Sequence, residues 1–202
     1  METISASKIP PILYIVARPP GVGKSTDAQE FVPYSVSALN HDEIEAEYKK
    51  MNVTDYEEKA NQKMWSSIHE NIALGIDFGI ELNLGTDDQY GLLKKIHGYC
   101  EHYEIHILLL FTDIYHLCIS RAEARARSGG HEVEPAVIED IRYNTLRLLK
   151  KNIAIVSHVT FIHVTYNSVE LVCSGYYPTG KHEFIHDVLP NWVTANFPEI
   201  AI

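Results

Sequence analysis

Apolar residues in this chain gather into short runs, and longer segments with one apolar face separate them. Runs of about four to eight apolar or alternating residues are typical of strands, whereas apolar positions spaced three and four apart are typical of helices. The predicted strands cover residues 12–17, 34–39, 76–82, 105–111, 159–166 and 169–174. The predicted helices cover residues 26–31, 42–50, 54–74, 86–99, 113–128, 135–152 and 191–197.

Strands and helices alternate along most of the chain, and this order predicts a doubly wound parallel sheet. The run 105–111 is almost continuously apolar, as expected for a central parallel strand covered on both faces. A short turn at 167–168 joins the last two strands into a hairpin. We therefore expect an α/β protein with a five-stranded, mostly parallel sheet and a C-terminal β-hairpin, whose ligands bind beyond the carboxyl ends of the strands.

Several helix ends carry local signals. Gly75 suits the C-terminus of the helix 54–74, and Pro135 suits the first position of the helix that follows it. Thr86 is expected to cap the next helix, and either Thr54 or Asp55 is expected to cap the helix 54–74.

Length, charge and cysteine content narrow the class of protein. The 202 residues suit a single domain, 1–202, with a core at about 10–175 and a C-terminal extension at 176–202. The formal net charge of −10, without a visible basic patch, disfavours binding to long nucleic acid. The three cysteines lack C-x-x-C spacing, and no signal peptide or membrane-length apolar run is evident. We expect a cytoplasmic protein with reduced thiols and no membrane partner.

The clearest functional motif is Gly-x-Gly-Lys-Ser-Thr, which lies between an apolar strand and a predicted helix. This is the context of a P-loop, whose backbone N–H groups surround a phosphate chain. Lys24 is expected to reach the β- and γ-phosphates of ATP, and Ser25 to place its hydroxyl on Mg²⁺. The predicted nucleotide-binding residues are Gly21, Val22, Gly23, Lys24, Ser25 and Thr26. The alternative is an ordinary glycine-rich turn.

One position departs from the full motif G-x-x-x-x-G-K-[ST], because Arg18 stands where the first glycine is expected. In one hypothesis the loop tolerates Arg18, because Gly21 and Gly23 still allow close approach and the guanidinium points outward or adds to phosphate binding. In the other, Arg18 is an inactivating replacement that alters the first turn of the loop. From the sequence we favour the second.

Polar residues follow the predicted strands at the edge where a ligand is expected. A kinase needs a base for the acceptor hydroxyl, and Asp42 is the candidate; the alternative is a helix cap. Glu81 could accept hydrogen bonds from sugar or polyol hydroxyls, unless it is a solvated charge. Asn83 and Thr86 could add polar contacts, unless they are loop and cap residues.

A second informative stretch concentrates arginines before two consecutive glycines. Arg121 and Arg125 share a helix face, Arg127 points elsewhere, and Arg142 follows one helix later. Guanidinium groups at a helix–loop junction suit a lid over phosphates, because each binds phosphate through a fork. A solvated helix face is the alternative. His131 could titrate or bind phosphate, or it could act as a cap or packing residue.

Several ordered pieces, spread over roughly residues 10 to 175, resemble the zeta-toxin family of P-loop kinases. These pieces are the segments 16–26, 40–43, 78–84 and 125–133, Ile138, Arg142-Tyr143 and Asn167-Ser168. The resemblance implies a three-layer P-loop kinase fold and ATP-dependent phosphorylation of a small molecule, such as UDP-N-acetylglucosamine or a related nucleotide sugar.

Carried over by motif, the resemblance assigns roles to individual residues. It implies that Asp42 is the catalytic base and that Glu81 binds the substrate. It implies that Lys24 and Ser25 hold ATP and Mg²⁺, and that Arg125 and Arg142 are arginines near the phosphates.

The chain also departs from the family pattern. Leu82-Asn83 stands where many members have two threonines, which leaves the acceptor open. A kinase for another acceptor, such as an antibiotic hydroxyl or a nucleic-acid 5′ end, is one alternative, although the acidic charge argues against the last. A non-catalytic nucleotide-binding or antitoxin-binding protein is another. A separate antitoxin is a partner that the resemblance leaves open.

Overall fold

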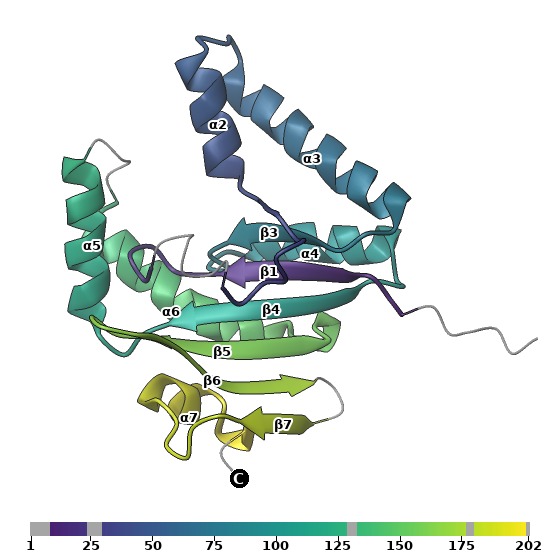
Figure 1. The fold of residues 1–202 in the computed structure, drawn as a ribbon. Coiled ribbons are helices and arrows are strands. Elements are labelled where there is room, and N and C mark those ends of the chain that lie inside the picture. The colour runs from purple at the N-terminus through teal and green to yellow at the C-terminus, as the bar shows by residue number, and fades with distance from the viewer. Residues whose placement is uncertain (1–8, 24–29, 129–132, 177–179, 201–202) are drawn as a thin grey trace, which may run out of the picture.

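The computed structural model describes residues 9–23, 30–128, 133–176 and 180–200. From β2 to β5, one or two helices separate each strand from the next (Figure 1). The strands are β1 (Ile12–Ala17), β2 (Ala38–Leu39), β3 (Phe78–Leu82), β4 (Glu104–Phe111), β5 (His158–Val164), β6 (Val169–Tyr176) and β7 (Lys181–Phe184). The helices are α2 (His41–Lys50), α3 (Tyr56–Leu74), α4 (Asp87–Tyr99), α5 (Tyr115–Arg127), α6 (Pro135–Lys151) and α7 (Asn191–Asn196), with 3₁₀ turns at Ile153–Ile155 and Pro198–Ile200.

The described strands form one sheet of seven, in the order β2-β3-β1-β4-β5-β6-β7. The first five in this order are parallel, and β6 and β7 each run antiparallel to the strand before them. The predicted α/β class, the parallel arrangement and the hairpin of β5 and β6 are confirmed. The predicted strand number was too low, because β7 is a largely exposed edge strand of polar sequence that no apolar run reveals.

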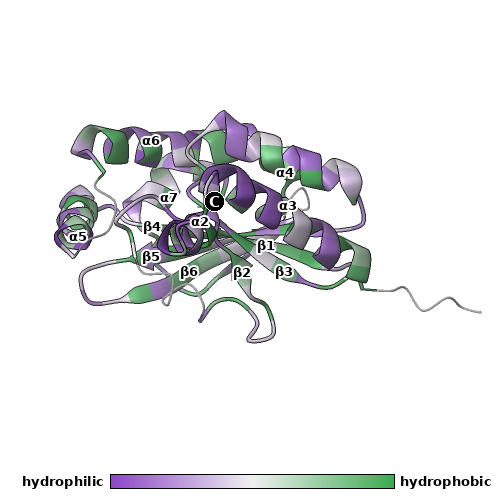
Figure 2. Cartoon of the chain, turned by 90° about the horizontal axis from the view of Figure 1, so that it is seen from above, coloured by the Kyte–Doolittle hydropathy of each residue, from purple (hydrophilic) through white to green (hydrophobic). Residues whose placement is uncertain are grey.

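Apolar side chains alternate across the sheet and build a core on each face. Leu13 and Ile15 of β1 point to one face, and Val16 points to the other. Helices α3, α4, α6 and α7 pack on the first face, and Figure 2 shows α3, α4 and α6 together on that side. Helix α5 and the loop residues Val22 and Val32 pack on the second face. The sheet is therefore covered on both sides, which explains why β1 and β4 are so apolar.

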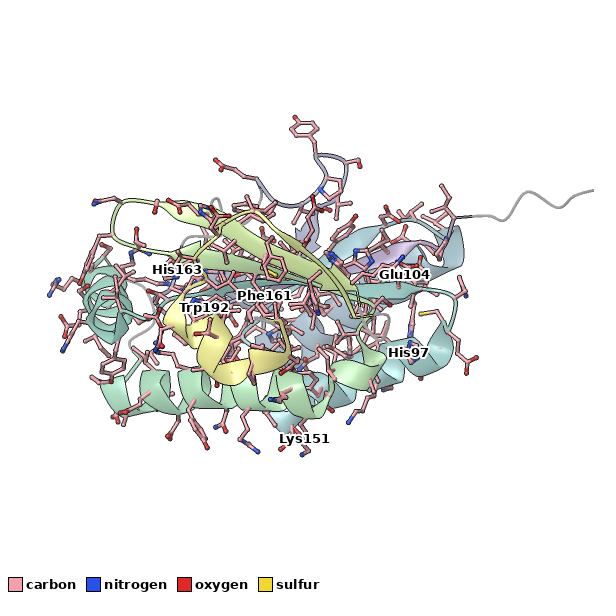
Figure 3. The ribbon with its side chains drawn as sticks, turned by 90° about the horizontal axis from the view of Figure 1, so that it is seen from below. His97, Glu104, Lys151, Phe161, His163 and Trp192 are labelled. Carbon is pink, nitrogen blue, oxygen red and sulfur yellow. The ribbon has the colours of Figure 1, made fainter. Side chains whose placement is uncertain are left out.

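The C-terminal extension completes the core at one end of the sheet. Trp192 of α7 packs against Phe111 and Phe161, with ring centroids 5.1 Å and 5.9 Å apart (Figure 3). Its indole Nε1 donates to Nδ1 of His163 at 3.1 Å. Burial lowers the pKa of His163, which favours the neutral ring that this hydrogen bond requires. The helix predicted at 191–197 therefore seals apolar surface.

Most helix-end predictions are confirmed. Gly75 ends α3 with a φ of 64°, and Pro135 is the first residue of α6. The hydroxyl of Thr86 accepts a hydrogen bond from the Gln89 N–H at 3.4 Å, which caps α4. Asp55 occupies the N-cap position of α3, as one of the two alternatives predicted, but it adopts a left-handed conformation and its side chain makes no capping bond.

Two further observations concern single segments. The strand predicted at 34–39 is shorter than expected, because the N–H of Val36 closes a turn on the carbonyl of Pro33 and leaves two residues for β2. In the described ranges, no helix combines the length and the apolar character needed to cross a bilayer.

Candidate active site

The loop after β1 makes its first turn at Gly21. The Arg18 N–H donates to the Leu82 carbonyl at 3.0 Å and so extends the pairing of β1 with β3. Gly21 has a φ of +77°, and a Cβ built on it would lie 2.1 Å from the backbone oxygen of Cys118 in α5. Both the conformation and the space therefore require glycine at this position.

The non-glycine residues with positive φ in the described ranges are Asn52, Asp55 and Leu84, so Arg18 does not adopt a backbone conformation that needs glycine. This geometry supports the hypothesis that the loop tolerates Arg18. It does not support the hypothesis that Arg18 distorts the first turn. The predicted phosphate and Mg²⁺ ligands Lys24, Ser25 and Thr26 lie outside the described residues, and their roles stay predictions.

Two arginines donate hydrogen bonds to backbone carbonyls of the loop. Nη1 of Arg121 donates to the carbonyl of Val22, while its Nη2 donates to the Thr165 carbonyl at 3.3 Å. Nη1 of Arg18 donates to the carbonyl of Gly23 at 2.5 Å. The C=O and the following N–H of a trans peptide point in opposite directions, so the Val22 contact turns the Gly23 N–H away from Arg121. Arg121 therefore positions the loop, instead of forming the predicted lid with Arg125.

Two adjacent cavities open beside this loop, at the carboxyl ends of β1 and β3. The first, which we call the acceptor-side cavity (about 570 Å³), is lined by residues of the loop, β3, α2, α3, α4, α5 and α6. The second, the loop-side cavity (about 580 Å³), is lined by the loop and α5. Arg18 and Arg125 line both cavities. The sequence-predicted residues at the acceptor-side cavity are Gly21, Asp42, Glu81, Asn83 and Arg125.

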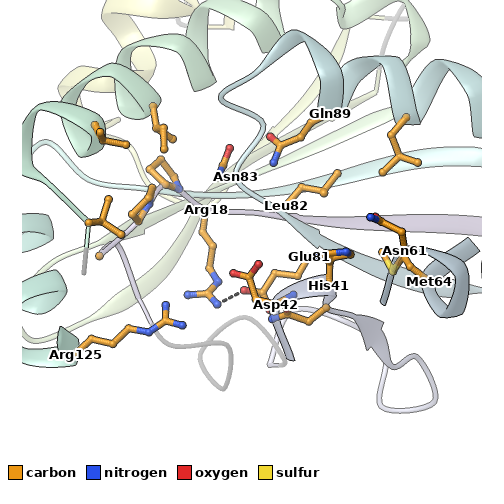
Figure 4. A pocket seen from close by; sticks show the side chains of 18 of the residues that line it. Arg18, His41, Asp42, Asn61, Met64, Glu81, Leu82, Asn83, Gln89 and Arg125 are labelled. Atoms are coloured by element: carbon orange, nitrogen blue, oxygen red, sulfur yellow. Dashed lines mark hydrogen bonds and ion pairs between the residues drawn. The ribbon is translucent and has the colours of Figure 1, made fainter. Parts of the chain in front are cut away.

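Glu81 lies in the acceptor-side cavity but is already bound on both oxygens. Its Oε1 forms an ion pair with Nη2 of Arg18 (Figure 4). Its Oε2 accepts a hydrogen bond from Nδ2 of Asn40 at 3.0 Å. The side chains of Arg18 and Glu81 are only 16% and 13% exposed. One hypothesis held that the guanidinium of Arg18 points outward or adds to phosphate binding. It points instead at Glu81, the predicted substrate-binding residue.

Asp42 lies in the first turn of α2 and faces the same cavity. The cap of α2 is Asn40, whose side-chain oxygen accepts from the N–H groups of Asp42 and Glu43 at 3.0 Å and 3.4 Å. Asp42 is exposed, and within the described ranges its carboxylate has no hydrogen-bond or ion-pair partner. The capping alternative for Asp42 is therefore wrong, and its carboxylate faces the cavity without a partner in the described ranges.

Two amide side chains lie deeper in the acceptor-side cavity. Asn83 Oδ1 and Gln89 Oε1 both accept the Gly85 N–H, at 2.8 Å and 3.1 Å. Gln89 was not predicted from the sequence. Gln89 lies in the first turn of α4, three residues after the cap Thr86, and this spacing was the one feature of the sequence that pointed to it. Thr86, which was predicted as a substrate contact, does not line the cavity because its hydroxyl caps α4.

The arginines of α5 and α6 divide by role. Arg125 is exposed, and no hydrogen bond or ion pair within the described ranges engages its guanidinium. Arg142 lines neither cavity. Its guanidinium donates to the Thr112 carbonyl at 2.9 Å and lies 4.7 Å from the centre of the Phe111 ring. In the described ranges the Arg142 side chain thus joins α6 to the end of β4, and its contact with the phosphates stays a prediction. His131 lies outside the described residues.

Comparison with known proteins yields similarity in structure. No known protein family matches the chain by sequence, and no curated protein does. A chain of the AvrRxo1-ORF1:ORF2 complex with ATP superposes with a TM-score of 0.64 at 10% identity, covering 89% of this chain and 62% of that one. A chain of the PezAT chromosomal toxin–antitoxin system of Streptococcus pneumoniae gives 0.52 at 19% identity, covering 81% and 72%.

A chain of the Pnkp1/Rnl/Hen1 RNA repair complex gives a TM-score of 0.57 at 19% identity, covering 74% of this chain and 49% of that one. This protein therefore spans about half of the RNA repair chain and less than two thirds of the AvrRxo1 chain. At these identities the likeness is one of fold. The chain shares its α/β fold with these solved structures.

Proposed function

We propose that this protein is an ATP-dependent kinase that transfers the γ-phosphoryl group to a hydroxyl of a small molecule, with a nucleotide sugar such as UDP-N-acetylglucosamine as the acceptor. One observation carries the proposal. Asp42, an exposed carboxylate without a protein partner in the described ranges, faces a cavity that adjoins the glycine loop. A base and a phosphate-binding loop on one cavity are what phosphoryl transfer to a hydroxyl requires.

The fit of ATP to the loop is supported by the geometry of Gly21 and by the arginines on the loop carbonyls. In the proposed arrangement, Lys24 and the loop N–H groups hold the phosphates, and Arg125 reaches over them from α5. Ser25 would hold Mg²⁺, which would supply positive charge to the phosphates.

Asp42 orients the acceptor hydroxyl and takes its proton as the phosphoryl group is transferred. Its position in the first turn of α2 directs the carboxylate into the cavity, whereas Asn40 holds that turn in place through its capping bonds. Arg125 neutralises the charge that develops on the transferring phosphoryl oxygens.

The experiment combines labelled ATP, a panel of nucleotide sugars, the natural protein and the variant Asp42→Asn. We expect labelled product from the natural protein and a loss of turnover of about a thousandfold in the variant, with nearly unchanged ATP affinity. Asp88→Asn removes a carboxylate from the first turn of α4, outside both cavities, and serves as the matched control. Turnover that barely changes in Asp42→Asn would show that the base is misassigned.

A second candidate is a nucleotide-binding protein that does not turn over its ligand. The observation that favours it is the occupation of Glu81 by Arg18 and Asn40. ATP binding without labelled product on any acceptor would favour this candidate.

The solved complexes of PezAT and AvrRxo1-ORF1:ORF2 pair two components, so a separate antitoxin is also part of the proposal.

A further inference from the structure

Arg18 gives the acceptor-side cavity a different charge from the one that the usual motif would give. The described charged residues that line this cavity, leaving histidine aside, are Arg18, Asp42, Glu81 and Arg125. Two arginines thus stand against two carboxylates. With glycine at position 18, one arginine would face two carboxylates, and the cavity would repel an anion.

The ion pair is held on several sides. Arg18 is bound to Glu81 and also to the Gly23 carbonyl, while Asn40 fixes the second oxygen of Glu81. Both charged side chains are mostly buried. Pairing with a buried guanidinium cancels most of the field that a carboxylate would project into the cavity. Glu81 therefore acts here as the internal counter-ion of Arg18, and its oxygens are not offered to acceptor hydroxyls.

Two amide side chains of the cavity present their NH₂ groups. The amide oxygens of Asn83 and Gln89 are both turned to the Gly85 N–H. Their NH₂ groups donate to no other residue in the described part of the chain, and both side chains line the cavity. Arg125 reaches the same space from the opposite wall (Figure 4). Donors and a guanidinium together recognise carboxylate or phosphate oxygens.

We propose that Arg18 is a specificity-determining residue: by neutralising Glu81, it allows the acceptor-side cavity to select a hydroxyl compound that carries an anionic group on the part lying in that cavity. The inference rests on the proposed kinase function and adds the charge of the acceptor to it. Asp42 keeps its role at the reacting hydroxyl, and the anionic group binds to Arg125 and the two amides.

The test measures equilibrium binding by calorimetry, without turnover, for two matched pairs of probes. UDP-glucuronate and UDP-glucose differ by one carboxylate, and glucose 6-phosphate and glucose differ by one phosphate. The proteins are the natural chain, Arg18→Gly, the double variant Arg18→Gly/Glu81→Gln, and Arg127→Ala. The last removes an equal charge from the exposed side of α5, where Arg127 is 73% exposed.

We expect the natural protein to bind the anionic member of at least one pair about tenfold more tightly than the neutral member. Arg18→Gly should abolish this preference, because it leaves Glu81 unneutralised, and Arg127→Ala should keep it. The double variant should regain anion binding, since the repelling carboxylate is gone, which also excludes misfolding as the cause.

Equal or tighter binding of both neutral probes by the natural protein would overturn the proposal. A preference that Arg18→Gly leaves unchanged, or no binding of any probe, would overturn it as well. Phosphoryl transfer is scored separately with labelled ATP. Transfer without an anion preference overturns this inference alone, whereas an anion preference without transfer supports it and overturns the kinase function.

Discussion

The ion pair between Arg18 and Glu81 predicts a measurable coupling in stability. Removing one partner leaves a mostly buried charge uncompensated, which costs about 3 kcal/mol of unfolding free energy by analogy with other buried pairs. Glu81→Gln keeps the size and polarity of its side chain and so isolates the loss of charge, whereas Arg18→Gln keeps a polar amide but shortens the side chain. Asn40 still donates to residue 81 in both variants.

The double variant should lose about as much unfolding free energy as either single variant, since removing the second charge leaves no unpaired charge behind. The expected coupling free energy is therefore about 3 kcal/mol. For a chain of 202 residues, each single variant should lower the melting temperature by about 6–12 °C.

Urea unfolding followed by circular dichroism at pH 7 measures these free energies, and an unchanged denaturant slope shows that the unfolding reaction is the same. Added salt should alter the coupling little, because both partners are mostly buried. Costs that simply add in the double variant would refute the reasoning. Single variants within about 0.5 kcal/mol of the natural protein would refute it too, since exposed pairs behave in that way.

Two further predictions concern the loop and the far end of the sheet. Gly21→Ala should weaken ATP binding at least about tenfold in titration calorimetry, because the added Cβ would lie 2.1 Å from a backbone oxygen of α5. Gly91→Ala is the control and should bind ATP normally, because nothing lies within 4 Å of the Cβ added there. Burial and the nearby His106 lower the pKa of His158 to about 4, below its ordinary 6.5. The unfolded chain therefore binds more protons between these values, so stability present above pH 6.5 should fall as the pH drops towards 4. His158→Gln should flatten this dependence in urea unfolding at pH 7 and pH 5, and an equally steep loss in the variant would contradict the assignment.

The architecture followed closely from the sequence. The apolar runs located β1, β4 and β5 because buried parallel strands need side chains that suit both covered faces. Helix ends were located at Gly75, Thr86 and Pro135, because the backbone conformation or hydrogen bond that favours each residue there depends only on its neighbours in sequence. The exposed edge strand β7 was missed, since its hydrogen bonds to β6 hold it in the sheet and no buried face marks it.

The candidate site was predicted in part. Asp42, Glu81 and Asn83 do meet at one cavity, because parallel strands bring their carboxyl ends to the same edge, and Arg125 reaches this cavity from the last turn of α5. Arg142 lines neither cavity, since its guanidinium binds a protein carbonyl that the sequence does not show to lie near.

The sequence by itself determined that Arg18 replaces the first glycine of a phosphate-binding motif, and that Gly21 is a glycine. Only the tertiary structure decided what those residues meet. Arg18 forms an ion pair with Glu81, which is 63 residues away, and Gly21 packs closely against a backbone carbonyl of α5. The physical reason is that a backbone conformation is a local property, whereas the partner of a buried charge is set by whichever element the fold brings beside it.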